Sequence, residues 1–201
     1  MQMIDKSAIL KEIIENRRIL KPEEFNGKII PEDILQKVLE AANWAPTHGL
    51  TEPWRFIVFS GKKGVLQFGQ LHAGLYKQET PEEHFLQKKY DTILHKPDHA
   101  SHLIVIVMKR GDKENIPEQE ELAATACAVQ NMLLTASGFG LAVYWGTGGM
   151  CYHPSFKKHF ELGEEDKIMG FLYMGYSDKE HTKGFRHTGM EEKTTWINNN
   201  P

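Results

Sequence analysis

Three cationic side chains, those of Arg17, Arg18 and Lys21, fall within five residues at the end of an amphipathic N-terminal stretch. Cations at the C-terminal end of a helix interact favourably with its dipole, so the cluster has a purely structural explanation. Arginine also binds phosphate through two parallel hydrogen bonds, so the same residues could form an anion site. The residues alone leave both interpretations open.

A loop of defined shape occupies the middle of residues 41–59, between the end of a predicted helix and an apolar strand. Pro46 and Pro53 bracket this loop, and a proline disfavours helical geometry in the residue before it. Gly49 adds a position with free φ. The loop therefore presents polar side chains at the end of a sheet, namely Thr47, His48, Thr51 and Glu52. Such a loop favours ligand binding, although polar residues are also the norm in a helix-to-strand connector.

Glycines follow the predicted strand 141–145 in the run Gly146-Thr147-Gly148-Gly149. The run has neither the GxGxxG spacing nor the following helix of a dinucleotide-binding fingerprint, and it is not a P-loop. Glycines after a strand do let backbone N–H groups approach a planar or anionic ligand closely. A simple glycine turn is the alternative interpretation.

Three histidines, His95, His99 and His102, have the spacing H-x3-H-x2-H and offer candidate metal ligands. Pro97 interrupts any helix that would align them on one face. No cysteine or obvious fourth ligand lies nearby in the sequence. We therefore predict no metal site.

The composition is that of an ordinary globular protein, with 40% hydrophobic and 25% charged residues in a chain of 201 residues, a length that fits one domain. The net charge of -3 argues against a general nucleic-acid binder. Cys127 and Cys151 form no CxxC motif, so neither a disulfide framework nor a cysteine-based zinc site is expected. The amphipathic N-terminus does not resemble a signal peptide, and no apolar run approaches the roughly 20 residues of a membrane span. We expect a cytoplasmic protein without a membrane partner.

The elements that must position these residues follow from the hydrophobic pattern. Helices are predicted over 7–18, 31–44, 117–137 and 154–162, and strands over 54–60, 103–108, 141–145 and 168–176. The first two strands hardly alternate, so both are expected to be buried on both faces. The Ala-rich helix 117–137 is apolar on nearly all sides, which favours the centre of a monomer or the seam of a dimer. Residues 65–97 are highly charged and predict helices that cover the core rather than belong to it.

Five segments resemble, in their order along the chain, the motifs of the nitroreductase family. Members of this family are FMN-dependent reductases of nitro compounds and quinones. Residues 17–21 resemble the motif R-R-S-x-R/K, and residues 45–54 resemble A-P-S-x-x-N-x-Q-P-W. Residues 138–149 resemble G-L-G followed by W-x-G-G. Residues 166–176 resemble the family's closing strand, and residues 186–196 its R-x-x-x-E-E-x-x-x-W tail with one extra residue. Five motifs in order make the resemblance specific.

The resemblance implies an α+β fold with a central mixed or antiparallel sheet flanked by helices. It also implies a domain-entwined homodimer with FMN at the subunit interface and helix 117–137 in the seam. Residues 1–201 would form one domain. Within it, a helical excursion at 65–97 would shape the substrate pocket, and residues 177–201 would form a C-terminal extension.

The resemblance carries cofactor-binding roles to particular positions. Arg17 and Arg186 match phosphate-binding arginines, and a backbone N–H of Gly148 or Gly149 would face flavin N5. His48 lies in a loop that the family places against the flavin from the other subunit. The complete set of implied FMN-binding residues is Arg17, Arg18, Ile19, Lys21, Thr47, His48, Leu50, Glu52, Trp145, Gly146, Thr147, Gly148, Gly149, Lys183 and Arg186.

Three positions depart from the family's motifs. Ile19 replaces the serine of R-R-S, so one hydroxyl toward the cofactor is missing. Leu50 replaces the asparagine of the loop, and Glu52 replaces the glutamine before Pro-Trp. Leu50 puts one hydrogen bond to the ring in doubt, and Glu52 adds a negative charge that would oppose an anionic reduced flavin.

The implied activity is transfer of hydride from NAD(P)H through N5 of tightly bound FMN to a small acceptor such as a nitroaromatic compound or a quinone. A ping-pong mechanism is expected, with no catalytic side chain because the flavin performs the chemistry. Three alternatives remain open. The first keeps the flavin fold but changes the reaction to dehalogenation, flavin fragmentation or azoline oxidation. The second is a non-catalytic FMN-binding protein, and the third is a metal-binding protein that uses His95, His99 and His102.

Overall fold

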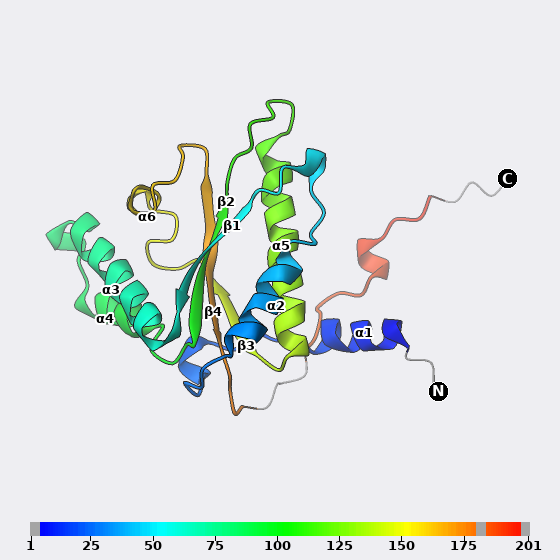
Figure 1. Ribbon diagram of the computed structural model, residues 1–201, viewed down its shortest axis with the longest axis horizontal. Coiled ribbons are helices and arrows are strands. Elements are labelled where there is room, and N and C mark those ends of the chain that lie inside the picture. Colours follow the sequence, from blue (N-terminus) through cyan, green and yellow to red (C-terminus); the bar gives the residue numbers. More distant parts are fainter. Residues whose placement is uncertain (1–4, 180–183, 198–201) are drawn as a thin grey trace.

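The computed structural model describes residues 5–179 and 184–197, and its centre is an antiparallel sheet of four strands. In spatial order the strands are β1 Trp54–Ser60, β2 His102–Met108, β4 Lys167–Gly175 and β3 Ala142–Gly146. Each neighbouring pair is antiparallel. With helices on both faces of this sheet (Figure 1), the predicted α+β class is confirmed.

Two helical layers cover the sheet. On one face lie α3 Gly61–Glu79, α4 Gln87–His95 and α6 Pro154–His159, and on the other lie α2 Glu32–Ala42 and α5 Glu118–Gly138 (Figure 1). The inner strand β2 is buried along its whole length, as predicted. A strand covered on both faces needs apolar side chains at successive positions, which explains why this segment does not alternate.

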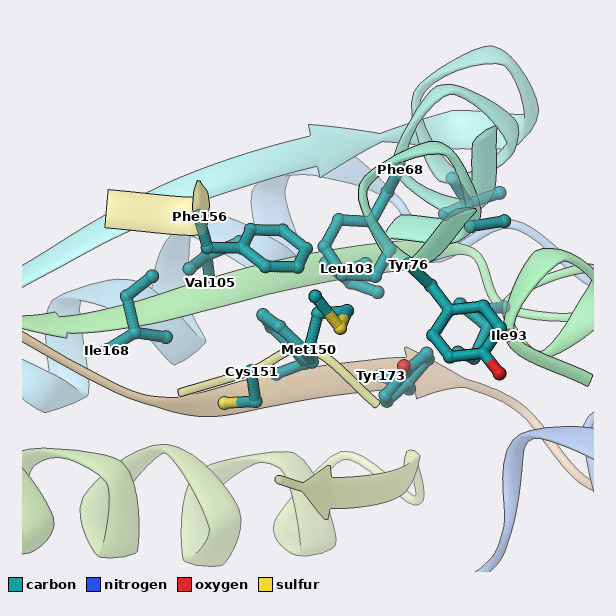
Figure 2. Packing of buried hydrophobic residues seen from close by; sticks show 14 of the residues in the cluster. Phe68, Tyr76, Ile93, Leu103, Val105, Met150, Cys151, Phe156, Ile168 and Tyr173 are labelled. Carbon is teal, nitrogen blue, oxygen red and sulfur yellow. The ribbon is translucent and has the colours of Figure 1, made fainter. Parts of the chain in front are cut away.

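Each face of the sheet has its own hydrophobic cluster, because successive side chains of a strand point to opposite faces. Leu103 and Val105 of β2 belong to the cluster beneath α3, which surrounds Phe68 and is shown in Figure 2. We call this group the α3-side cluster. Ile104 and Ile106 belong to the other cluster, beneath α2 and α5. The strand therefore holds both helical layers in place.

β1 forms an edge of the sheet, and its burial differs from the prediction. Its bounds agree with the predicted strand 54–60. The expected burial on both faces is wrong, since Arg55, Val58 and Ser60 are exposed. Within the described residues β1 pairs with β2 alone, and the helices leave part of its surface open.

Residues 61–95 contribute to the core as well as to the surface. The short helix η3 Glu82–His84 separates α3 from α4. Four residues of α3 follow one another at helical spacing and are buried: Val65, Phe68, His72 and Tyr76. The expectation that this charged stretch only covers the core is therefore wrong. Its polar residues lie on the outer side of an amphipathic helix whose inner side packs on the sheet.

α1 Lys6–Asn16 starts close to the predicted position but has a different N-cap. Asp5, not Ser7, caps it, because its Oδ1 accepts hydrogen bonds from the N–H groups of Ser7 at 3.0 Å and Ala8 at 3.2 Å. α1 and residues 184–197, which include η4 Glu191–Lys193, extend away from the sheet and are called the two arms (Figure 1). Neither arm contains a buried residue. Large apolar side chains on both arms are exposed: Ile9, Leu10, Ile14, Phe185, Met190, Trp196 and Ile197.

α5 has 21 residues, which span about 30 Å at 1.5 Å per residue. One side packs on the sheet through small side chains such as Ala124 and Ala128. The opposite side leaves Ala123, Cys127 and Gln130 exposed in the single chain. Among the described helices, none combines the length and the hydrophobicity that crossing a membrane requires.

Candidate functional site

A cluster of arginines forms where the two arms leave the body of the protein. Arg17 and Arg18 follow α1, and Arg186 approaches from the C-terminal arm. Burial lowers the pKa of Arg17, and the charges of Arg18 and Arg186 lower it further. A pocket of about 450 Å³ lies here, lined by residues including Arg18, Gly184 and Arg186. The Arg18 guanidinium lies directly against Gly184, where a Cβ would overlap it. The cluster is electrostatically suited to a multiply charged anion.

The chain next reaches the outer edge of β3. The N–H of Leu20 donates to the carbonyl oxygen of Val143 in β3 at 3.4 Å, and the side chain of Leu20 is buried. The turn η1 Pro22–Glu24 follows and is fixed because the N–H of Lys21 donates to Glu24 Oε2 at 2.8 Å. Lys21 itself is exposed beside this edge, where it lines a second pocket with Tyr144. The arginine cluster and Lys21 thus lie near the start of β3.

Trp145, near the end of β3, is hydrogen-bonded to a β-bulge in β4. Opposite the bulge, Ile106 pairs with Gly170 and Val107 with Ile168, so Met169 has no partner in β2. The Trp145 indole Nε1 donates to the carbonyl oxygen of Met169 at 3.0 Å. The indole holds one orientation beside the strand end.

The glycine run after β3 combines one open and one tightly packed position. A Cβ at Gly148 would meet no atom within 4 Å, so this residue faces open space. Gly149 has φ +70°, and a Cβ there would overlap the imidazole of His72. The Nε2 atom of His72 accepts a hydrogen bond from the N–H of Met150 at 2.9 Å. The loop is therefore fixed from the α3 side and open on the other.

A pocket of about 580 Å³ adjoins Trp145 and Thr147. It lies where β4 extends beyond β3, which pairs only with the segment from Phe171 to Gly175. Other lining residues come from the start of α5, the start of β4 and the segment after the glycine run: Glu118, Leu122, Lys167, Ile168, Met169, Cys151 and Tyr152. Lys167 and Glu118 form an ion pair of 3.4 Å at this pocket.

The loop between α2 and β1 is stabilised differently. Thr47 Oγ1 lies 3.1 Å from Thr51 Oγ1 and accepts from the N–H of Glu52 at 3.2 Å. The short helix η2 His48–Leu50 contacts the start of α5, where the His48 Nδ1 pairs with the carboxylate of Glu120. Leu50 and Glu52 have positive φ values of 55° and 44°. Such values strain a residue with a side chain, and asparagine tolerates them better than leucine.

The candidate metal ligands are engaged in local hydrogen bonds. His95 Nδ1 lies 3.0 Å from Asp98 Oδ2, and His102 Nδ1 lies 2.7 Å from Ser101 Oγ. Burial lowers the pKa of His102. Within residues 5–179 and 184–197, no three His, Cys, Asp or Glu side chains are arranged to hold a metal ion.

Comparison with known proteins places this geometry in a family. The sequence profile of the nitroreductase family matches residues 14–176. The chain belongs to this family. It is 31% identical over 146 residues to YdjA of Escherichia coli K12, which covers 70% of this chain and 74% of that protein. It is 27% identical over 180 residues to YfhC of Bacillus subtilis, which covers 89% of each chain. Both relatives are provisionally named as NAD(P)H nitroreductases.

Solved structures share the nitroreductase fold. A nitroreductase-like family protein from Bacillus cereus matches with a TM-score of 0.80 and 27% identity over 98% of both chains. A nitroreductase from Bacteroides fragilis, solved with bound FMN, matches with a TM-score of 0.70 and 22% identity over 94% of this chain and 98% of that chain. The predicted family is confirmed.

Within one chain, the candidate residues of this nitroreductase-family protein fall into separate groups. Thr47, His48, Leu50 and Glu52 lie in the loop that contacts the start of α5. The arginine cluster lies near the other end of α5, where Gly138 approaches Ile13 of α1. About 30 Å of helix separates the two groups. Trp145 and residues 146–149 lie at the end of β3, and Lys183 lies outside the described residues.

Sequence reasoning missed two residues that shape the site. His72 fixes the glycine run, and the carbonyl of Met169 orients Trp145. His72 gave one usable signal, because it occupies a polar position at helical spacing among Val65, Phe68 and Tyr76. The bulge at Met169 gave none, since it depends on the pairing of β4 with β2.

Proposed function

We propose that this protein is an FMN-dependent oxidoreductase that uses NAD(P)H to reduce small acceptors such as nitroaromatic compounds or quinones. The observation that carries the proposal is the arrangement along the outer edge of β3. Arg17, Arg18 and Arg186 gather near its start, and the glycine run follows its end. The five residues of β3 span about 16 Å at roughly 3.3 Å per residue, so the edge joins an anion site to a backbone donor site.

The arginine cluster fits the phosphate of FMN in charge. Neither Arg17 nor Arg186 has a carboxylate partner among the described side chains, and Arg17 is destabilised by its cationic neighbours. A phosphate that carries nearly two negative charges would relieve this repulsion through bidentate hydrogen bonds. Lys183, by its place in the sequence, is a further candidate for this phosphate.

The glycine run fits the edge of a planar ring. Gly148 has open space where a side chain would be, which lets the backbone approach a ring closely. An N–H of Gly148 or Gly149 would donate to flavin N5, and the fixed indole of Trp145 would line the ring together with Gly146 and Thr147. Bound FMN supplies the chemistry, in that its ring accepts a hydride and passes it to the acceptor.

Cations near the edge of β3 would tune the cofactor. Lys21 and Arg18 are the candidates to face N1 and C2=O of the flavin ring, where negative charge accumulates when the flavin is reduced. Ile19 is more than half exposed and offers no hydroxyl to the cofactor. The protein therefore supplies charge, orientation and exclusion of water rather than a nucleophile.

A homodimer would complete the site. The loop that holds Thr47, His48, Leu50 and Glu52 is too far along α5 to meet the arginine cluster of its own chain, but it could meet that of a partner. The exposed strip of α5 and the apolar side chains of the two arms offer surface to bury. Sedimentation at several protein concentrations tests this, and a monomer at all of them would contradict it.

The first experiment is a visible spectrum of the protein purified without added cofactor. Paired near-ultraviolet and blue absorption bands are expected, and a colourless protein that also takes up no added FMN would contradict the proposal. Initial rates with NADH or NADPH and a panel of acceptors then test the reaction, and parallel double-reciprocal lines are expected for ping-pong transfer. FMN bound without oxidation of either nucleotide would instead favour a binding protein, to which the departures at Ile19, Leu50 and Glu52 would point.

A further inference from the structure

We propose that His72 is a positioning residue whose buried imidazole sets the direction of the backbone N–H groups of Gly148 and Gly149 toward flavin N5. The inference rests on the proposed FMN site. It adds a residue of α3, distant from the glycine run in sequence and on the opposite side of it from the open space at Gly148. It also gives part of the 65–97 excursion a role in the site.

The contact to the loop is direct and defines the state of the imidazole. The Nε2 atom of His72 accepts from the N–H of Met150 at 2.9 Å, so the proton of the neutral ring is on Nδ1. The side chain is 3% exposed, and burial, assisted by the charge of Lys96, lowers the pKa of His72 to about 3. The ring therefore stays neutral, and Nε2 stays an acceptor, throughout the physiological pH range.

Aromatic neighbours hold the imidazole in place. The rings of Phe68, Phe156 and Phe171 surround it with centroid distances of 5.5, 5.1 and 5.2 Å and edge-to-face geometry. The side chain of Met150 is itself buried in the α3-side cluster, and Figure 2 shows it among the rings and strands there. The end of the glycine run is thus fixed through both its backbone and its side chain.

Gly149 transmits this fixed position to the open part of the loop. Its φ of +70° is unfavourable for residues with a side chain, and a Cβ would overlap the His72 ring. The backbone of Gly149 therefore lies directly against the imidazole. Because Met150 and Gly149 are both set by His72, the orientation of the preceding peptide groups is set as well.

A residue that only fills space would be replaceable by an apolar side chain of similar size. An acceptor would be replaceable by glutamine, whose amide oxygen can reach the position of Nε2. The test therefore compares His72→Leu with His72→Gln. Tyr76→Phe is the matched control, because Tyr76 lies on the same helix and its hydroxyl accepts from the N–H of Leu86 at 3.1 Å, away from the glycine run.

Two measurements are made on each variant. Amide hydrogen exchange of peptides covering residues 146–152 is followed in the protein without FMN, and the midpoint potential and the rate of flavin reduction by NAD(P)H are followed in the FMN-loaded protein. His72→Leu is expected to lose protection, to shift the potential and to slow reduction about 10- to 100-fold, as a misplaced contact does. His72→Gln and Tyr76→Phe are expected to stay close to the unmodified protein, and all variants should keep FMN because the arginines are unchanged.

The outcomes separate this inference from the proposed function. Equal behaviour of His72→Leu and His72→Gln in both measurements would overturn the inference and leave a packing role. A loss of protection without any change in potential or rate would also overturn it. If the unmodified protein binds no FMN, the proposed function fails, and the exchange data still decide whether His72 fixes the loop. Should His72→Leu not fold, His72→Asn replaces it, since its shorter amide cannot reach the position of Nε2.

Discussion

The loop after β3 and the loop before β1 both contain a glycine with positive φ, but they are stabilised in opposite ways. In the loop after β3, Gly149 takes the positive φ and a buried histidine accepts from the next N–H. In the loop before β1, Leu50 and Glu52 take positive φ values beside Gly49, and both are exposed. The first loop is organised by its own chain. The second keeps positive φ at two exposed residues, although Thr47 Oγ1 accepts from the N–H of Glu52 and Lys113 Nζ donates to the carbonyl oxygen of Gly49.

The largest change in stability is expected for Gly149→Ala, which tests the loop after β3. The new Cβ would meet the His72 imidazole at a φ that disfavours alanine, so the free energy of unfolding should fall by about 2–4 kcal/mol. Urea unfolding at fixed protein concentration measures it. Gly148→Ala is the matched control, and its effect should stay within about 0.5 kcal/mol because a Cβ there meets nothing. Equal effects at the two positions would remove the distinction between a packed and an open glycine.

The next test is the pH dependence of stability. The folded protein keeps His72 neutral down to about pH 3, whereas the unfolded chain takes up a proton near pH 6.5. Between these values the unfolded state binds more protons, so stability contributed by His72 is complete above pH 6.5 and falls as the pH is lowered. At pH 5 the expected loss is about 2 kcal/mol relative to pH 8. Urea unfolding of the unmodified protein and of His72→Gln isolates this part, and identical pH profiles would contradict it.

In the loop before β1, a substitution should stabilise the protein rather than destabilise it. Leu50→Asn should raise the free energy of unfolding by roughly 1 kcal/mol, because asparagine adopts positive φ at lower cost. Leu50→Ala removes the exposed side chain but keeps the strain, so it should give no such gain. Thermal or urea unfolding of both variants is the measurement. Destabilisation of similar size by both variants would contradict the strain at Leu50 and would mean that its side chain contributes to packing.

The smallest effect is expected where the strained loop meets α5. Glu120→Gln removes the charge that pairs with His48, and both side chains are substantially exposed. Exposed pairs contribute a few tenths of a kcal/mol to stability and weaken with salt. Unfolding at low and high ionic strength should show this small difference disappear. A loss several times larger, unaffected by salt, would mean that the pair is shielded from solvent.

The elements themselves were predictable because their signals are local. The apolar run 103–108 and the glycine and proline boundaries gave strand and helix positions to within one or two residues. The exception is α6, which ends at His159, three residues before the predicted end at residue 162. The edge position of β1 was not predictable, because it depends on which strands pair. The same holds for the distance between His48 and Arg17, which follows from the packing of α5 between two segments far apart in sequence. The helical spacing could mark His72 as a buried polar residue but not as an acceptor, since a buried histidine has the same spacing whether it packs or accepts a hydrogen bond.

The bulge at Met169 has a consequence for how the protein can change over evolution. The extra residue reverses the alternation of β4, so that Ile168 shares a face with Phe171, although three positions separate them. Deleting Met169 would make the pairing of β4 with β2 regular, with Ile168 still opposite Val107 and on the face of Phe171. The deletion would remove the carbonyl oxygen that orients Trp145 and a residue that lines the adjacent pocket. Selection that keeps the extra residue would therefore act on the orientation of Trp145 and not on the pairing of β4 with β2.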